Sequence, residues 1–406
     1  MSDTSPERIV IIGAGQAAAQ AVASLRAEGY AGALTVVGDE PFPPYQRPPL
    51  SKTYLAGTFE RERLFLKPDA FYAEAKCELV LGTTARAIDR AKKSVELSDG
   101  RSLSYDKLLI ATGSRVRRIQ VPGATLAGIH YLRAIADVDA LRPAFQSAKH
   151  LAVVGGGYIG LEVAAVARKY GLAVTVFEAM DRVMARAVSR PVSAFYEEVH
   201  RAAGVAFEMN TGVEAFEGNG KLEAIHAGGK VYAADVALVG IGVVPVCDLA
   251  LAAGLECQDG IRVDPFCATG DPDIFAAGDC TRHHGRDGQL IRLESVQNAI
   301  DQAKHAALSM LGRPVAYREV PWFWSDQYDL KLQIAGLAGP SDKIVLRGDQ
   351  NQRKFAVFHL REGRVAAVEA VNAAPEYIVG RKLIADGAIV AAERLADTAI
   401  PMKNIS

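Results

Sequence analysis

The sequence predicts an α/β fold in which one βαβ design occurs twice and a smaller α+β domain follows. A glycine-rich turn at residues 13–18 directly follows an apolar, strand-like run, and a second such turn at residues 155–160 follows another. Near Pro321 the composition changes, because aromatic residues cluster there and alternating strand-like segments begin. A chain of 406 residues has room for about two or three domains.

Each glycine-rich turn has the spacing that binds the pyrophosphate of a dinucleotide. The first Gly permits the tight turn, the second lets the backbone approach the pyrophosphate, and a small third residue lets the helix pack against the strand. Helix-like segments follow at residues 17–27 and 159–169, and their first N–H groups would face the phosphates. The alternative is two ordinary turns of an unrelated α/β fold. The binding residues expected are Gly13, Gly15, Ala17 and Ala18, then Gly155, Gly157, Ile159 and Gly160.

A second strand-like run follows each turn and ends in an acid about 20 residues past the motif, where a ribose hydroxyl would bind. After the first turn this acid is Asp39 or Glu40, and after the second it is Glu178. A carboxylate about 4 Å from the 2′-phosphate of NADPH would repel it by about 4 kcal/mol, so we expect a preference for NADH of roughly two to three orders of magnitude. Arg182 is near enough in sequence to offset part of this preference.

The composition is that of an ordinary globular protein, with 50% hydrophobic residues, 23% charged residues and a net charge of −1. This balance gives no global attraction to nucleic acid or to an anionic membrane. No apolar run approaches the roughly 20 residues of a membrane helix, and the early apolar run is too short for a secretion signal. We therefore expect a cytoplasmic protein that binds neither nucleic acid nor membrane.

The five cysteines are widely spaced, and no two of them form a CxxC or CxxxxC pair. An enzyme that reduces disulfides through a flavin needs such a pair of thiols, so this chemistry is not expected. The spacing also gives no disulfide framework, as in a reducing compartment. We expect the five cysteines to be small buried residues, with the first of them in a helix-like stretch. They are Cys77, Cys247, Cys257, Cys267 and Cys280.

Further strands and turns follow from local patterns. Asp99-Gly100 and Gly228-Gly229 are the turns of two expected hairpins. Apolar strands are expected at residues 108–113, 236–242 and 273–279, a helix at 295–311, and strands of the last domain at 331–335, 354–360 and 364–371.

A series of motifs along the chain makes it resemble one family. This family is the FAD-containing, NADH-dependent ferredoxin reductases of bacterial oxygenase systems, of the putidaredoxin reductase type. The resemblance covers essentially the whole chain. Its carriers are GAG at 13–15, RPPLSK at 47–52, ATG at 111–113, YLR at 131–133, GGGYIGLE at 155–162, AGD at 277–279, ESVQNA at 294–299 and PWFWSDQ at 321–327.

The resemblance implies a glutathione-reductase-like fold with two Rossmann-type nucleotide-binding domains and a C-terminal α+β domain. The FAD-binding domain would comprise residues 1–115 and 246–320. The NAD-binding domain, with a bridging segment, would occupy residues 116–245, and the C-terminal domain residues 321–406.

The resemblance also implies a function. An enzyme of this kind binds FAD non-covalently, takes electrons from NADH and passes them singly to an acidic [2Fe–2S] ferredoxin, which supplies a cytochrome monooxygenase or a ring-hydroxylating oxygenase. It requires no nucleophile and no metal site of its own. Two other functions share the fold: an NADH oxidase or disulfide reductase, and an NADH-responsive binding module of the apoptosis-inducing-factor type.

Three residues take catalytic positions by the resemblance. Lys52 follows a segment stiffened by prolines and would lie near the reactive nitrogen of the flavin, where a cation favours the reduced, anionic form; otherwise it is an ordinary surface lysine. Glu162 would pair with Lys52 where nicotinamide meets flavin, unless it only stabilises the start of its helix. Trp324 would lie near the flavin, on the route by which electrons leave.

The resemblance assigns further residues to the cofactors. Asp279 would reach the ribityl or phosphate part of FAD, although an acid there could also cap a helix. Asp39 is favoured over Glu40 for the adenosine ribose. The other cofactor-binding positions are Arg47, Pro48, Lys52, Ala85, Thr112, Gly113, Arg133, Gly242, Gly278, Val296 and Trp324.

Because the partner ferredoxin is acidic, its docking face on this chain should be basic. Lys304, on the expected helix 295–311, matches a docking position of the family, and Lys331 and Arg347 are further candidates in the last domain. The alternative is that these charges are simply solvated. Electrostatic docking weakens as salt is added.

Overall fold

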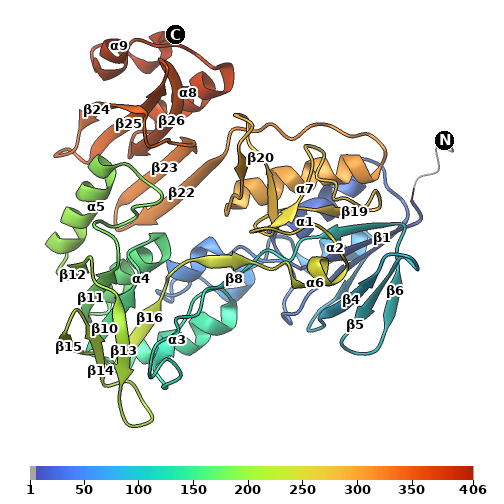
Figure 1. Cartoon of the computed structure of the whole chain (residues 1–406), viewed down its shortest axis with the longest axis horizontal. Coiled ribbons are helices and arrows are strands. Elements are labelled where there is room, and N and C mark those ends of the chain that lie inside the picture. Colours follow the sequence, from blue (N-terminus) through green and yellow to red (C-terminus); the bar gives the residue numbers. More distant parts are fainter. Residues whose placement is uncertain (1–5, 406) are drawn as a thin grey trace. The chain divides into compact units, whose positions relative to one another are not determined.

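A computed structural model describes residues 6–405 of the chain. It divides into two compact units, each assembled from three separate segments of the sequence (Figure 1). The first unit contains the residues up to Gln46, Arg61–Arg115 and Val244–Pro321, and the second contains Arg47–Glu60, Val116–Val243 and Trp322–Ser406. None of the helices within residues 6–405 is long and apolar enough to cross a membrane.

The first unit is built on a parallel sheet with helices against it. Its helices are α1 (Gln16–Ala27), α2 (Asp69–Glu74), α6 (Asp248–Ala252), α7 (Val296–Met310) and the 3-10 helix η2 (Arg61–Leu64). Its strands are β1 (Arg8–Ile12), β2 (Ala33–Val37), β3 (Cys77–Val80), β4 (Ala85–Asp89), β5 (Ser94–Leu97), β6 (Ser102–Ser104), β7 (Lys107–Ile110), β18 (Ile261–Arg262), β19 (Ile274–Ala276), β20 (Thr281–His284) and β21 (Leu290–Ile291).

The order of the parallel sheet is β19-β7-β1-β2-β3, so the connections run to opposite sides of β1. Ligands of such sheets bind beyond the carboxyl ends of the strands, at the point where the order reverses. That point is the end of β1, where the first glycine-rich turn begins.

Both faces of this sheet are buried, as the continuous apolar run of β1 predicts. Ile9 and Ile11 belong to a core that includes α1 and α7, which lie side by side. Val10 and Ile12 belong to the core on the other face, which includes Val95 of the antiparallel sheet β4-β5-β6. Alternate residues of β1 therefore pack into the two cores on opposite faces of the sheet.

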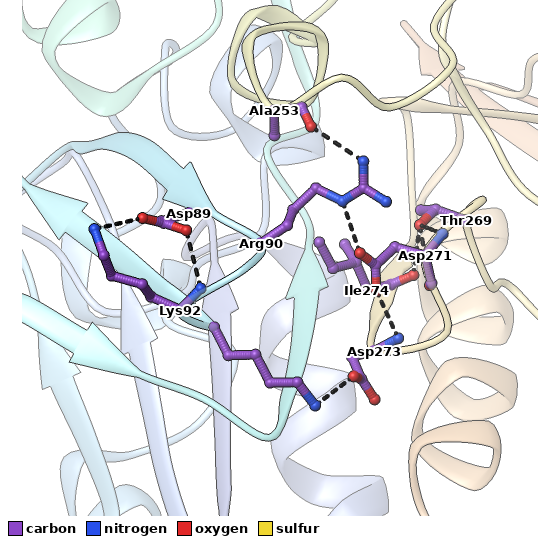
Figure 2. Close-up of polar contacts among 9 residues, drawn as sticks. Asp89, Arg90, Lys92, Ala253, Thr269, Asp271, Asp273 and Ile274 are labelled. Atoms are coloured by element: carbon purple, nitrogen blue, oxygen red, sulfur yellow. Dashed lines mark hydrogen bonds and ion pairs between the residues drawn. The ribbon is translucent and has the colours of Figure 1, made fainter.

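A network of polar contacts connects the antiparallel sheet to the segment before β19 (Figure 2). Arg90, directly after β4, donates to the Asp271 carboxylate at 2.7 Å and to the carbonyl oxygen of Ala253 at 3.4 Å. Asp271 also accepts the N–H of Asp273 at 3.0 Å, and both aspartates stand just before β19. The network helps to hold the strand whose far end leads to Asp279.

The second unit repeats the parallel design and adds an antiparallel sheet. Its helices are α3 (Ile135–Ser147), α4 (Tyr158–Lys169), α5 (Arg190–Ala202), α8 (Ala374–Asp386), α9 (Ala392–Ala396) and the 3-10 helices η1 (Pro48–Ser51) and η3 (Met402–Asn404). Its strands are β9 (Ile129–His130), β10 (His150–Val154), β11 (Ala173–Glu178), β12 (Val205–Met209), β13 (Val213–Glu217), β14 (Ala224–Ala227), β15 (Lys230–Ala233), β16 (Val236–Val239), β22 (Trp322–Gln327), β23 (Leu330–Gly336), β24 (Lys343–Asp349), β25 (Lys354–Arg361) and β26 (Arg364–Val371). Strands β8 (Ser114–Val116) and β17 (Val243–Pro245) lie where the chain passes from one unit to the other.

The second parallel sheet has the order β12-β11-β10-β16-β9, with the second glycine-rich turn after β10. The last part of the chain forms the antiparallel sheet β22-β23-β26-β25-β24, against which α8 packs (Figure 1). Within the second unit, the carboxylate of Glu369 on β26 accepts the N–H of Ser189 at 2.8 Å, just before α5. A buried contact thus connects the antiparallel sheet with the start of α5.

The two expected hairpins are confirmed. Strands β5 and β6 pair across Asp99-Gly100, and β14 and β15 pair across Gly228-Gly229. The placement of Cys77 in a helix-like stretch is wrong, because Cys77 begins β3 and pairs with Leu34 of β2. Lys76, at φ +46°, turns the chain out of the preceding helix.

Candidate functional site

The first glycine-rich turn has the geometry of an anion site at a helix start. Gly13 has φ +107°, and a Cβ there would lie 2.2 Å from the carbonyl oxygen of Ala111, so only glycine fits. Above Gly15 the space is open, because a Cβ at this position would have no atom within 4 Å of it. Gly15 is also the N-cap of α1 and supplies no side-chain cap. The first N–H groups of α1 therefore stay available for phosphate.

The second turn repeats this geometry. Gly155 has φ +103°, and a Cβ there would lie 2.5 Å from the carbonyl oxygen of Gly240, whereas the space over Gly157 is open. A Cβ at Gly160 would lie 2.2 Å from the carbonyl oxygen of Gly155, so the third position of this turn requires glycine. In the first turn the third position holds Ala18, which is completely buried. Each turn thus presents open backbone at its second glycine.

The acid after each turn is placed differently. Glu178 accepts the N–H of Gly156 at 2.7 Å and the N–H of Met180 at 2.8 Å, so its carboxylate is fixed beside the second glycine-rich turn. Glu40 accepts the hydroxyl of Tyr45 at 2.7 Å, while Asp39 is exposed. Asp39 is therefore the more exposed of the two acids after the first turn.

Arg182 is held by backbone carbonyl groups near Glu178. Its Nη1 donates to Val188 at 2.9 Å and its Nη2 donates to Ala185 at 2.8 Å. Both terminal nitrogens therefore have protein partners, and recruiting them to a 2′-phosphate would cost these hydrogen bonds.

The segment Gly278-Asp279 meets the first glycine-rich turn inside the first unit. A Cβ at Gly278 would lie 3.6 Å from that of Ala17 and 3.5 Å from that of Ala299 on α7. The carboxylate of Asp279 accepts the hydroxyl of Ser114 at 2.8 Å. The N-cap of α7 is Ser295, which accepts the N–H of Asn298, so Asp279 does not cap this next helix.

The remaining first-unit candidates lie on the same elements or beside them. Thr112 follows β7 and donates its hydroxyl to the carbonyl oxygen of Val246 at 2.7 Å, and Gly113 has φ +66°. Ala85 begins β4 and Val296 begins α7, and both are partly exposed.

Lys52 and Glu162 form an ion pair inside the second unit, with 2.8 Å between Nζ and Oε1. Glu162 is the fifth residue of α4 and is 4% exposed, so it lies beyond the first turn of the helix and is not a simple helix-end charge. Two hydroxyls also donate to its carboxylate: Ser51 to Oε2 at 2.5 Å and Ser325 to Oε1 at 2.6 Å. The sequence reasoning missed both serines, although they stand within the quoted RPPLSK and PWFWSDQ motifs.

The other second-unit candidates are placed around this pair or the second turn. Arg47 donates from Nη1 to the carbonyl oxygen of Arg133 at 2.5 Å, and Pro48 opens η1. Gly242, at φ +96°, has open space over it. Trp324 precedes Ser325 on β22 and is partly exposed, with its ring 5.6 Å from that of Trp322.

One of the three docking candidates is wrong. Arg347 is 4% exposed, and its guanidinium donates to the carbonyl oxygens of Leu395, Asp397 and Ile400 and to the carboxylate of Glu376. A cation used in this way holds the last segment against the sheet and cannot face a partner. The side chains of Lys304 and Lys331 are exposed, with Lys304 paired to Asp301 at 3.0 Å.

All five cysteines are free thiols, and four of them are buried. Burial raises the pKa of the partly exposed Cys257 to about 12 and the pKa of Cys280 to about 11. Such thiols are poor nucleophiles at neutral pH. Among residues 6–405, no group of three or more His, Cys, Asp or Glu side chains could hold a metal ion.

Two family models match the chain: pyridine nucleotide-disulphide oxidoreductase over residues 7–303 and reductase C-terminal over residues 322–406. The chain belongs to the ferredoxin reductases of the pyridine nucleotide-disulphide oxidoreductase family. Rhodocoxin reductase of Rhodococcus erythropolis is 45% identical over 399 residues, which cover 97% of this chain and 93% of that protein.

Two further comparisons concern ferredoxin systems. The ferredoxin–NAD(+) reductase component of the anthranilate 1,2-dioxygenase system of Burkholderia cepacia is 42% identical over 402 residues, covering 98% of this chain and 99% of that protein. The crystal structure of the covalent putidaredoxin reductase–putidaredoxin complex matches with a TM-score of 0.95 and 40% identity, covering 98% of each chain. The resemblance inferred from the motifs is confirmed.

Proposed function

We propose that this ferredoxin reductase passes electrons from NADH, through non-covalently bound FAD, one at a time to an acidic [2Fe–2S] ferredoxin. That ferredoxin would supply a cytochrome monooxygenase or a ring-hydroxylating oxygenase. The observation that carries the proposal is the pair of open glycine-rich turns, one on each parallel sheet, because two dinucleotides can then bind one chain. The cytoplasm is the expected location.

The first unit fits FAD. The open backbone over Gly15 and the uncapped start of α1 suit a pyrophosphate, and Asp39 is accessible for a ribose. Bound FAD would accept a hydride from NADH and return electrons singly to a one-electron carrier. The first-unit residues proposed to hold it are Gly13, Gly15, Ala17, Ala18, Asp39, Ala85, Thr112, Gly113, Gly278, Asp279 and Val296. Arg47, Pro48 and Arg133 are proposed for FAD from the resemblance to the family alone.

The second unit fits NADH. Gly155, Gly157, Ile159 and Gly160 would bind the pyrophosphate, and Gly242 lies two residues beyond the backbone that packs under Gly155. The fixed carboxylate of Glu178 would accept hydrogen bonds from a ribose diol and repel a 2′-phosphate. Since Arg182 is held by carbonyl groups, we expect NADH to be the working coenzyme.

Lys52, Glu162 and Trp324 are the proposed reaction residues. Glu162 holds the ammonium group of Lys52 in one place, and buried donors hold Glu162 in turn. We propose that the pair acts where the nicotinamide is oriented, with Trp324 on the route of the departing electrons. A fixed charge at this point lowers the barrier without rearranging during the reaction.

The experiment is reduction of the purified protein by NADH without oxygen, followed in a stopped-flow spectrometer, and then mixing with a panel of [2Fe–2S] ferredoxins. Rapid bleaching of the flavin absorbance followed by fast reoxidation on mixing with one ferredoxin is expected. A colourless protein that does not take up flavin would refute the proposal. Slow bleaching with a long-lived charge-transfer band would instead favour the NADH-responsive binding module.

A further inference from the structure

His200, on α5, is completely buried, and the proposed function gives it no role. Its Nε2 lies 2.9 Å from Oε1 of Gln327, and its Nδ1 lies 3.1 Å from the hydroxyl of Tyr328. Burial lowers the pKa of His200 to about 4, so the imidazole is neutral near pH 7. A neutral imidazole has one N–H, so one ring nitrogen donates and the other accepts.

The contacts continue from His200 to the Lys52–Glu162 pair. Gln327 donates from Nε2 to the hydroxyl oxygen of Ser325 at 3.2 Å, and Ser325 donates to Oε1 of Glu162 at 2.6 Å. The side chains of Ser325, Gln327 and His200 are at most 1% exposed. A continuous hydrogen-bonded chain, from Tyr328 to Glu162, therefore runs through the interior of the second unit.

The charge of Glu162 determines the direction of every bond in this chain. A carboxylate only accepts, so Ser325 donates its single proton to Glu162 and can only accept from Gln327. The amide NH₂ of Gln327 therefore faces Ser325, and its carbonyl oxygen faces His200. Nε2 of His200 must then carry the proton, and Nδ1 must accept the hydroxyl proton of Tyr328. All donors point toward the carboxylate.

We infer that Ser325, Gln327 and His200 are positioning residues, which hold Glu162 as an oriented carboxylate against Lys52. The importance of the Lys52–Glu162 pair rests on the proposed function, but the polarised chain is a property of the second unit alone. Hydrogen bonds to the charged form stabilise a buried carboxylate, and bonds aligned in one direction strengthen each other.

The chain orients Glu162 and does not conduct protons. The amide of Gln327 could pass on a proton only through its unstable imidic acid form, whereas it accepts and donates hydrogen bonds without any chemical change. Its role is therefore to keep the charge of Glu162 in one place. Ser51, which donates to the second carboxylate oxygen at 2.5 Å, limits rotation of the carboxylate from the other side.

The first test is the tautomer of His200, which does not depend on turnover. Long-range ¹H–¹⁵N correlation spectra of the ¹⁵N-histidine-labelled holoprotein would be recorded at pH 7, with His200→Gln as the assignment variant. We expect neutral His200 with the proton on Nε2. His283, a second buried histidine whose pKa burial lowers to about 4, is the internal reference for a neutral ring. A proton on Nδ1, or a charged ring, would overturn the inference.

The second test separates positioning from general support of the fold. Ser325→Ala should lower the limiting rate of flavin reduction by NADH about tenfold, because a hydrogen bond to a charged group is lost. In a Glu162→Gln background the same substitution should change the rate less than about twofold. An equal loss in both backgrounds would mean that Ser325 does not act through Glu162.

The matched control is Ser189→Ala, which removes another buried serine hydroxyl that donates to a carboxylate, that of Glu369, at 2.5 Å. It should lower Tm and leave the limiting rate unchanged. A loss of rate as large as that of Ser325→Ala would mean that loosening of the unit explains both. If the Ser325→Ala variant does not fold, the tautomer of wild-type His200 still tests the inference. A wild-type protein that NADH does not reduce would refute the proposed function, without affecting the tautomer result.

Discussion

At the scale of the single residue, this enzyme depends on charges whose positions are held by the backbone. Glu178 is held by the N–H groups of Gly156 and Met180, so its charge stays beside the second turn. Arg182, the nearby cation that could favour NADPH, donates instead to backbone carbonyl groups. The coenzyme preference should therefore follow the one fixed charge.

Replacing Glu178 tests this account. In Glu178→Gln the shape and a hydrogen-bonding oxygen remain, but the repulsion of a 2′-phosphate is gone. We expect the ratio of kcat/KM for NADH over NADPH to fall by about tenfold or more. The measurement is steady-state flavin-dependent turnover with both coenzymes. The control is Asp181→Asn, which removes an exposed acid close in sequence and should leave the ratio unchanged; an unchanged ratio in Glu178→Gln would contradict the account.

His200 should make stability depend on pH. Its pKa is about 4 in the folded protein and 6.5 in an ordinary histidine, so between these values the unfolded chain binds more protons. The free energy of unfolding therefore falls as the pH is lowered from 6.5 toward 4. From pH 7.5 to pH 5 this one group accounts for about 2 kcal/mol.

Urea denaturation of the wild type and of His200→Gln at these two pH values would measure the effect. The wild type should lose about 2 kcal/mol more than the variant on going to pH 5. Because His283 remains in both proteins, its own contribution cancels. An identical pH dependence in both proteins would show that His200 is not held neutral.

At the scale of the element, the two βαβ units use the same turn with different requirements at its third position. A Cβ at Gly160 would lie 2.2 Å from the carbonyl oxygen of Gly155, whereas the first unit has a buried alanine, Ala18, at this position. The second glycine is different, because both Gly15 and Gly157 face open space. Packing therefore explains the third position, whereas no packing contact explains the second, where we propose that a ligand approaches the backbone.

Two alanine substitutions in the second turn should separate packing from binding. The methyl group added in Gly157→Ala meets no atom, so the free energy of unfolding should change by no more than about 1 kcal/mol. KM for NADH should rise about tenfold or more. Gly160→Ala forces a methyl group into backbone and should cost about 1–3 kcal/mol of stability. Thermal unfolding and NADH titration would be compared for both. A stable Gly160→Ala protein, or unchanged NADH binding in Gly157→Ala, would contradict this assignment.

At the scale of the whole molecule, the nearly neutral net charge does not show which cations are exposed to a partner. The net charge is −1, and Arg347 is used inside the C-terminal sheet. Lys304 and Lys331 remain exposed. Long-range attraction to an acidic ferredoxin should therefore depend on such surface lysines and decrease with salt.

Charge reversal at these lysines tests the docking proposal. Lys304→Glu or Lys331→Glu should raise KM for ferredoxin about threefold or more at low salt and flatten its dependence on ionic strength, while reduction of the flavin by NADH is unchanged. Lys230→Glu, at an exposed lysine of β15, is the matched control and should have little effect. Turnover that is equally fast from low to high salt would refute electrostatic docking.

Local sequence patterns by themselves were enough to predict much of the fold and the family. Glycines at fixed intervals, an acid after the next strand and a period of two along the strands act over a few residues, so the sequence predicted two nucleotide-type units and both hairpins. It also revealed the family. Lys52 and Glu162 were named only through the resemblance to the family. The pattern misplaced Cys77, since the turn at Lys76 interrupts an apparently helical stretch.

Only the tertiary structure showed which distant side chains contact Glu162 besides Lys52. Ser51, Glu162, His200 and Ser325 come from four separate segments, and no local period relates them. Likewise, the residues next to Arg347 in the sequence do not show that its guanidinium donates to carbonyl groups about 50 residues later in the chain. A spacing along the chain specifies a turn, whereas burial and partners depend on how whole elements pack, which is why the sequence could suggest Lys52 and Glu162 but not the side chains that support them.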